Sequence, residues 1–218
     1  MIRAACSIGT FHPQHAVPSA PTFQTKIMDP AVINAMAKWP NVPACYGWLA
    51  LDARGRWRLG VENSEIVRHT GLAAFLSRNY VGNDSGEWFC QNGPQRVFVA
   101  LETTPFVLHL DVAGQFNTHT GQPIEQPSAA LIDASGRLYI VSELGVSAVD
   151  DRDLGRLFDG LSNAAGQPAS DTQIEALLQS AASDLWLSIG ALRLPVSPTR
   201  AEDLSSEFGF QRNPLPAG

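Results

Sequence analysis

Hydrogen-bonding side chains gather around one predicted turn near the middle of the sequence. Gln91, Asn92, Gln95 and Arg96 surround Gly93-Pro94, and Glu102 ends the strand predicted to follow. The planar guanidinium of an arginine binds carboxylate or phosphate through paired hydrogen bonds, so Arg96 would hold an anion. Tyr46, Trp48, Trp57 and Trp88 would supply apolar walls.

We therefore predict a site for a small, anionic ligand. Its expected residues are Arg96, Gln95, Asn92, Glu102 and Tyr46. The alternative is a hairpin turn with a salt-bridged rim, because Asn92-Gly93 is a strong turn signal in its own right and tryptophans commonly lie in the core.

A second group of side chains could instead form the acid/base pair of an enzyme: Glu102, Asp111, His109 and His119. A three-residue loop with Gly114 left-handed places His109 opposite Asn117 and His119 opposite Val107, on one face of a hairpin. A two-residue loop would put the histidines on opposite faces. Two histidines are too few for a metal site, since Asp111 is needed by the turn, and we predict neither a metal nor a cofactor.

Sequence motifs of the common enzyme classes are absent. No Gly-rich phosphate loop, His-Glu-x-x-His or Gly-x-Ser-x-Gly occurs in the chain. We therefore expect a non-catalytic module that binds a small ligand, with the enzyme and a protein-interaction scaffold as alternatives.

Composition excludes several partners and suggests a compartment. The 218 residues carry 15 Lys and Arg against 21 Asp and Glu, a net charge of −6, which leaves no cationic excess for nucleic acid. No apolar run reaches the roughly 18 residues of a membrane span. Three cysteines without a Cys-x-x-Cys pair indicate neither disulfides nor structural zinc, and so predict a cytoplasmic protein.

One turn motif recurs and organises the predicted fold. Asp or Asn, two residues, Gly, a polar residue and a large apolar residue occur four times, beginning at Asp52, Asn83, Asp111 and Asp133. The side chain at the first position bonds its own backbone, and Gly accepts a positive φ. The spacing is too irregular for a propeller or solenoid. We predict an α+β fold in which antiparallel β-meander sheets, with or without duplicated subdomains, carry flanking helices.

Helix signals surround these hairpins. Asp29 and Pro30 start a helix over 29–38, and Ser64 precedes an apolar period over 64–80. Residues 151–161 are helical in pattern, and Ser170 with Gln173 forms a capping box. A strand over 185–194 follows, and Thr199 caps a last helix that reaches Leu204.

The expected domain organisation is one α+β domain over 28–213. Residues 1–27 are expected to be a disordered extension and 214–218 a tail. Subdomains 28–105 and 106–213 are the alternative. Because Met28 directly precedes the first helix signal, we expect translation to start there or at Met1.

Several short segments together resemble a family of uncharacterised proteobacterial proteins of unknown function. They are Trp39-Pro40-Asn41-Val42-Pro43, Gly47-Trp48-Leu49, Asn79-Tyr80, Gln91-Asn92-Gly93-Pro94-Gln95-Arg96-Val97 and Phe208-Gly209-Phe210. A second uncharacterised bacterial family, built of repeated motifs and proposed to act in signalling, is similar in 55–57, 86–88, Glu102 and Pro105-Phe106. The first resemblance implies no activity; the second favours duplication and a link to signalling.

Overall fold

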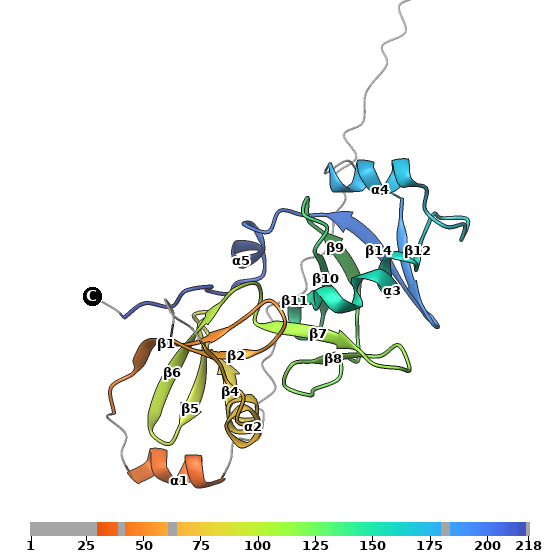
Figure 1. Ribbon diagram of the computed structural model, residues 1–218. Helices are drawn as coiled ribbons and strands as arrows, with labels where there is room; N and C mark the ends of the chain where they lie inside the picture. Colours follow the sequence, from red (N-terminus) through yellow and green to blue (C-terminus); the bar gives the residue numbers. More distant parts are fainter. Residues whose placement is uncertain (1–29, 39–41, 61–64, 180–183, 217–218) are drawn as a thin grey trace, which may run out of the picture.

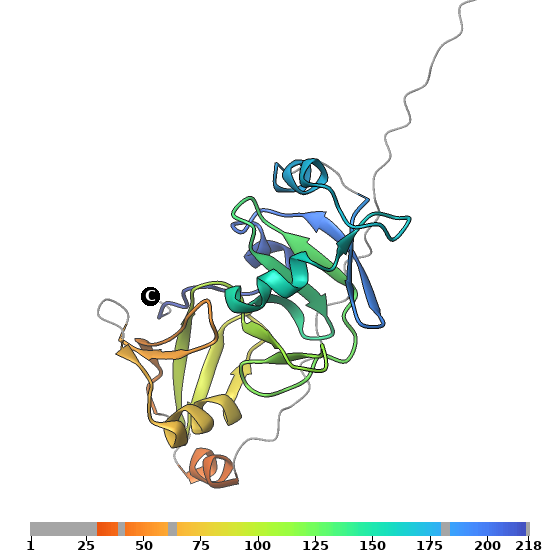
Figure 2. The same cartoon turned by 45° about the vertical axis from the view of Figure 1, so that its right-hand side comes forward.

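The computed structural model describes residues 30–38, 42–60, 65–179 and 184–216. Within these residues the strands form two mixed sheets that lie next to each other and carry short helices (Figure 1). Figure 2 shows the same arrangement from a second side. The predicted α+β class is therefore confirmed, while the sheets contain parallel as well as antiparallel strand pairs, where the sequence predicted antiparallel meanders.

The first sheet holds six strands of the described residues, in the order β3-β2-β1-β6-β5-β4. Helix α2 (Thr70–Arg78) packs on one face of this sheet, and α1 (Pro30–Lys38) lies at one end of it (Figure 1). The strands are β1 (Cys45–Leu51), β2 (Trp57–Leu59), β3 (Glu65–Ile66), β4 (Tyr80–Gly82), β5 (Trp88–Asn92) and β6 (Gln95–Leu101).

The second sheet holds eight strands of the described residues, in the order β12-β13-β14-β9-β10-β11-β7-β8. The strands are β7 (Phe106–Leu110), β8 (Phe116–Thr118), β9 (Ala129–Ile132), β10 (Leu138–Ser142), β11 (Gly145–Val149), β12 (Leu161–Ser162), β13 (Trp186–Ile189) and β14 (Leu192–Pro198). The helices are η1 (Asp151–Asp153), α3 (Leu154–Phe158), α4 (Asp171–Leu178) and α5 (Leu204–Glu207).

The predicted turns have the expected hydrogen bonds. Asp52 Oδ1 accepts the backbone N–H groups of Arg54 (3.0 Å) and Arg56 (2.9 Å), and Gly55 has φ +71°. Asn83, Asp111 and Asp133 bind their own turns in the same way. Asn163 forms a further turn of this kind. The sequence motif does not include it, because Pro168 stands where the motif has a large apolar residue.

The same strand arrangement occurs twice, in repeat 1 (residues 45–102) and repeat 2 (residues 129–199). The order β3-β2-β1-β6-β5-β4 of repeat 1 matches β11-β10-β9-β14-β13-β12 of repeat 2. Every pairing keeps its direction, including the parallel pairs β1/β6 and β9/β14. The helix between the third and fourth strands, α2 or α3, is also retained. The β7–β8 hairpin lies between the repeats.

Two apolar clusters form the core. One lies between α2, the first sheet and the facing strands of the second sheet; the other lies under α3 and α4 on the far face of the second sheet. Residues 199–216, the C-terminal strap, return to the first cluster, where Leu204 and Phe210 are buried. The strap is held by backbone hydrogen bonds from Gln211 N–H to Gly86 O (2.8 Å) and from Leu101 N–H to Arg212 O (2.7 Å).

Several element boundaries differ from the sequence predictions. The helix expected over 64–80 begins at Thr70, because His69 Nδ1 accepts the N–H of Leu72 (3.1 Å) and residues 65–66 pair with β2 instead. The strand expected over 185–194 is the hairpin β13–β14, with Gly190 at φ +57° in its turn. The last helix starts at Leu204, not after Thr199, whose N–H bonds Ile132 O.

Other predictions agree or lie outside the described part. The Ser170–Gln173 capping box is present. Gly114 has φ +83° and His109 pairs with Asn117, as the three-residue loop requires. Asp29, Ser64 and the expected extension 1–27 lie outside the described residues.

Candidate functional site

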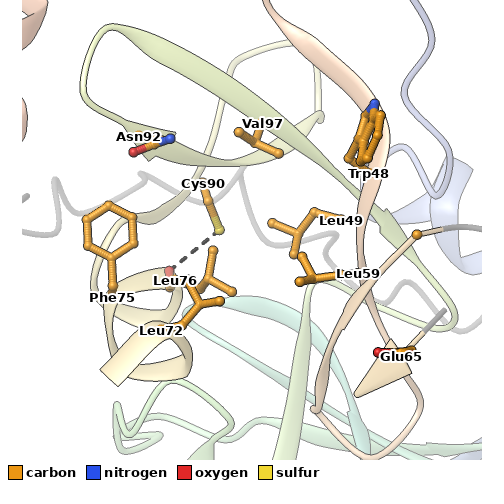
Figure 3. A pocket seen from close by; sticks show the side chains of 11 residues that line it. Trp48, Leu49, Leu59, Glu65, Leu72, Phe75, Leu76, Cys90, Asn92 and Val97 are labelled. Carbon is orange, nitrogen blue, oxygen red and sulfur yellow. Dashed lines mark hydrogen bonds between the residues drawn. The ribbon is translucent and has the colours of Figure 1, made fainter. Parts of the chain in front are cut away.

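An apolar pocket of about 490 Å³ opens between α2 and the first sheet. Figure 3 shows side chains from α2 on one side of it and from β1 and β2 on the other, with Cys90 of β5 between them. The volume lies in the range of small-ligand sites in proteins. The lining residues are Trp48, Leu49, Leu59, Gly60, Glu65, Leu72, Phe75, Leu76, Cys90, Asn92 and Val97.

An irregularity in β1 brings Trp48 to the rim of the pocket. Cys45 pairs with Val97 and Leu49 pairs with Val99, so four steps along β1 match two along β6. Gly47 accommodates the extra residues at φ +72°. As a result Trp48 lines the pocket while 67% of its surface stays exposed.

Helix α2 contributes the opposite wall. Leu72, Phe75 and Leu76 are spaced i, i+3 and i+4, so they share one face of the helix. The fully buried thiol of Cys90 donates a hydrogen bond to Leu76 O (3.5 Å), which ties β5 to the end of this helix. The wall is therefore continuous from the helix to the sheet.

The pocket is suited to an apolar group. Trp48, Leu59 and Leu72 are 67%, 48% and 37% exposed, and all three line it. The titratable side chains among the lining residues are Glu65 and Cys90, and the other lining side chains are mostly apolar.

The residues predicted to bind a ligand are only partly together. Asn92 lines the pocket, whereas Tyr46 lies on the other face of the sheet and stacks on Phe98 with ring centroids 4.4 Å apart. Arg96 places its guanidinium 5.0 Å from the centre of the Phe89 ring on that same face. These side chains form an aromatic stack outside the pocket.

Gln95 and Glu102 have other partners. Gln95 Nε2 donates to Pro43 O (3.2 Å), at the end of the β5–β6 hairpin. Glu102 Oε2 accepts the N–H of Ala53 (3.0 Å) at the opposite end of β6. Six residues of strand put Glu102 roughly 20 Å from Arg96, so the structure does not bring the two together.

His109 and His119 lie on the same face of the β7–β8 hairpin, as the three-residue loop predicted. His119 is packed between aromatic rings, with centroids 5.3 Å from Trp57 and 5.5 Å from Tyr80. Its Nδ1 accepts the N–H of Val107 (3.4 Å). Burial raises the pKa of the neighbouring Tyr80 phenol well above its ordinary value, so the Tyr80 side chain is neutral.

The carboxylates of the enzyme alternative are used by the backbone. Asp111 binds the N–H groups of Ala113 and Gln115 in its own turn, and Glu102 binds Ala53. His109 Nδ1 instead lies 3.2 Å from a carboxylate that was not predicted, Asp150. Among the described residues, no group of three or more His, Cys, Asp or Glu is placed to hold a metal ion.

Sequence reasoning missed most of this pocket because it searched for polar residues. Trp48 was considered as a possible apolar wall, and the structure places it there, while Trp57 and Trp88 are buried in the core. The signal available in the sequence was Gly47 within an otherwise apolar strand, which commonly marks a bulge.

Comparisons with known proteins identify relatives of unknown activity. The family model DUF2944, described as "Protein of unknown function (DUF2946)", matches residues 28–215. No curated protein matches the sequence. A crystal structure of a DUF1285 family protein from Silicibacter pomeroyi DSS-3 is 15% identical, covers 84% of this chain and 94% of its own, and has a TM-score of 0.45. No helix in the described residues has the length and apolar character to cross a membrane.

Proposed function

Because the chain belongs to the DUF2944 family, whose function is unknown, we propose from its pocket that it is a non-catalytic binding module for a ligand with an apolar group. The observation that carries this proposal is that three exposed apolar side chains, Trp48, Leu59 and Leu72, line one cavity. Burying a large apolar side chain stabilises a complex by about 1.5–3 kcal/mol. A ligand that covers these side chains gains part of this free energy on binding.

Further details extend the sequence predictions. We propose a cytoplasmic location, since Cys45 and Cys90 are both free thiols. An association with signalling rests on the family resemblance. The anion-binding role predicted for Arg96, with Gln95, Glu102 and Tyr46, stays a prediction; its residues lie outside the pocket, apart from Asn92.

Two fluorescent probes test the proposal: 1-anilinonaphthalene-8-sulfonate, which is apolar with an anionic group, and the neutral dye Nile red. We expect both to bind the wild-type protein. Leu72→Glu places a charge in the apolar wall and should weaken both probes by roughly tenfold or more. Val112→Glu makes the same change at an exposed turn residue away from the pocket and serves as the control.

The outcomes separate the two binding proposals. If Leu72→Glu and Val112→Glu bind both probes as the wild type does, the pocket is not the site. If Arg96→Ala weakens only the anionic probe, Arg96 has the ligand-binding role predicted from the sequence. If Arg96→Ala leaves both probes unchanged, that role is excluded for these ligands.

A further inference from the structure

Repeat 2 contains a helix that repeat 1 lacks. In repeat 1 a tight turn at residues 83–86 joins β4 directly to β5. In repeat 2 the corresponding connection, from β12 to β13, includes α4. Helix α4 lies over β14, the equivalent of β6 (Figure 1).

The strand registers show which positions correspond. Leu49 and Ala130 each precede the equivalent turn residue, Asp52 or Asp133, by three positions, so they correspond. Leu49 pairs with Val99 and Ala130 pairs with Val196, so Val99 corresponds to Val196. Two residues back along the same face, Val97 of β6 therefore corresponds to Leu194 of β14.

The next strand extends this correspondence. Cys90 pairs with Val97, and Leu187 pairs with Leu194, so Cys90 corresponds to Leu187. Leu49, Cys90 and Val97 all line the pocket of repeat 1.

In repeat 2 these positions are covered. Leu177 of α4 is fully buried in the same apolar cluster as Leu187 and Leu194, and Ile174 and Leu178 pack against that cluster. The three α4 side chains have the spacing i, i+3, i+4 of a single helix face. The fold thus uses an amphipathic helix to cover this face of the sheet.

The first helix of the chain does not take that place in repeat 1. Helix α1 lies at the end of the β5–β6 hairpin, where a Cβ atom on Gly93 would stand 3.5 Å from Ala35 Cβ. None of the described residues of α1 lines the pocket. The pocket therefore stays open beside α1.

We propose that the pocket docks an amphipathic helix of a partner protein, which presents apolar side chains at i, i+3 and i+4 in the manner of α4. This inference rests on the proposed function and specifies its ligand. The helix lies across β1 and β6 and buries Trp48, Leu59 and Leu72, as in other helix-in-groove complexes.

A peptide with the sequence of residues 168–179 is the probe. Short helices are marginal in water, so a lactam bridge between Asp171→Lys and Glu175, both exposed in α4, holds it helical. The control peptide carries Ile174→Ser and Leu177→Ser with the same bridge. Fluorescence anisotropy measures binding of each labelled peptide to the full chain, and displacement of Nile red reports the site.

We expect saturable binding of the first peptide, displacement of Nile red, and affinity lower by roughly tenfold or more for the control peptide and for the Leu72→Glu protein. Val112→Glu should bind as the wild type does. If Nile red binds but the first peptide neither binds nor displaces it, or if both peptides bind equally, the helix inference is wrong and the proposed function stands. If neither dye nor peptide binds, both are wrong.

Discussion

Arg96 and Arg193 occupy equivalent positions in the two repeats, and each lies over an aromatic ring of the adjacent strand. The Arg96 guanidinium carbon is 5.0 Å from the centre of the Phe89 ring, and that of Arg193 is 4.7 Å from Trp186. The strand registers show that Arg96 corresponds to Arg193 and that Phe89 corresponds to Trp186. The shared geometry points to a contact that belongs to the fold.

Replacing either arginine should therefore cost stability. We expect Arg96→Ala to lower the free energy of unfolding by about 0.5–1 kcal/mol, the usual value of an exposed cation–π contact. Arg193→Ala should lower it by more, because Arg193 Nη2 also donates a hydrogen bond to Ala164 O (3.1 Å). Urea unfolding measures the change. Arg137→Ala, which lacks such a ring contact among the described residues, is the comparison. A stable Arg96→Ala protein beside a destabilised Arg193→Ala protein would contradict the equivalence.

The carboxylates of two turns make stability depend on pH. The net effect of the surroundings lowers the pKa of both Asp52 and Asp133. Burial alone would raise each pKa, but hydrogen bonds to the carboxylates outweigh it. The donors are Arg56 and Arg54 at Asp52, and Ser135, Tyr139 and Arg137 at Asp133. A lowered folded-state pKa stabilises the fold above the unfolded value of about 3.9 and ceases to do so as pH falls through the folded value.

We therefore expect the free energy of unfolding to fall from about pH 4 downward. Asp133→Asn should reduce this slope and also lower stability at pH 7, because Tyr139 Oη donates to Asp133 Oδ2 (2.8 Å). Chemical unfolding between pH 7 and pH 2 measures both effects. Asp84→Asn changes an exposed carboxylate in the second position of its turn and should leave the slope nearly unchanged. Equal slopes for wild type and Asp133→Asn would contradict the prediction.

Two turn glycines separate backbone strain from close packing. Gly86 and Gly136 both end an Asx-x-x-Gly turn, with φ +78° and +80°. A Cβ atom on Gly86 would lie 2.3 Å from Gly209 O of the C-terminal strap, whereas one on Gly136 would have no atom within 4 Å. Gly136→Ala should cost about 1–2 kcal/mol for the left-handed conformation alone.

Gly86→Ala should cost more, because the strap must also move. We expect faster cleavage by trypsin after Arg200 and Arg212 in Gly86→Ala than in Gly136→Ala, since both arginines are already exposed and a released strap frees their backbone to enter the protease. Mass spectrometry of timed digests shows the order of cleavage. Equal cleavage rates and equal stabilities would show that the strap is not held at Gly86.

Local chemistry explains what could be predicted from the sequence. The turn at Asp52, the capping box at Ser170 and the loop that pairs His109 with Asn117 all depend on residues within about five positions of one another. Their geometry follows from side-chain hydrogen bonds and glycine φ angles. These features were predicted correctly for that reason.

Contacts between distant segments could not be predicted in the same way. The parallel pair β1/β6 joins Leu49 to Val99, and nothing local in either strand specifies the partner. The predicted polar residues do not come together, because Arg96 lies near the start of β6 and Glu102 directly follows its end, so the length of that strand separates them. The pocket depends on the contact of α2 with β5, and on a bulge whose effect on Trp48 appears only when β6 is in place.

Repeat 2 indicates how to close the pocket without unfolding the protein. Cys90 corresponds to Leu187, which is fully buried where α4 covers the sheet, and Cys90 is itself fully buried among the residues that line the pocket. Cys90→Leu should therefore push its neighbours into the base of the pocket. Overpacking a dense core costs about 1–3 kcal/mol. The open volume of the pocket takes up part of the displacement, so we expect a loss of stability at the lower end of this range, about 1 kcal/mol.

Binding should weaken as well. We expect Cys90→Leu to weaken Nile red by roughly tenfold or more, because the leucine takes volume that the dye would occupy. Cys90→Ala removes the thiol without filling the pocket, so it should keep the dye and lose the hydrogen bond to Leu76 O, about 1 kcal/mol. Dye titration with urea unfolding of the same samples makes the comparison. Loss of the dye in Cys90→Ala as well would assign binding to the thiol, whereas wild-type affinity in Cys90→Leu would place the dye elsewhere on the protein.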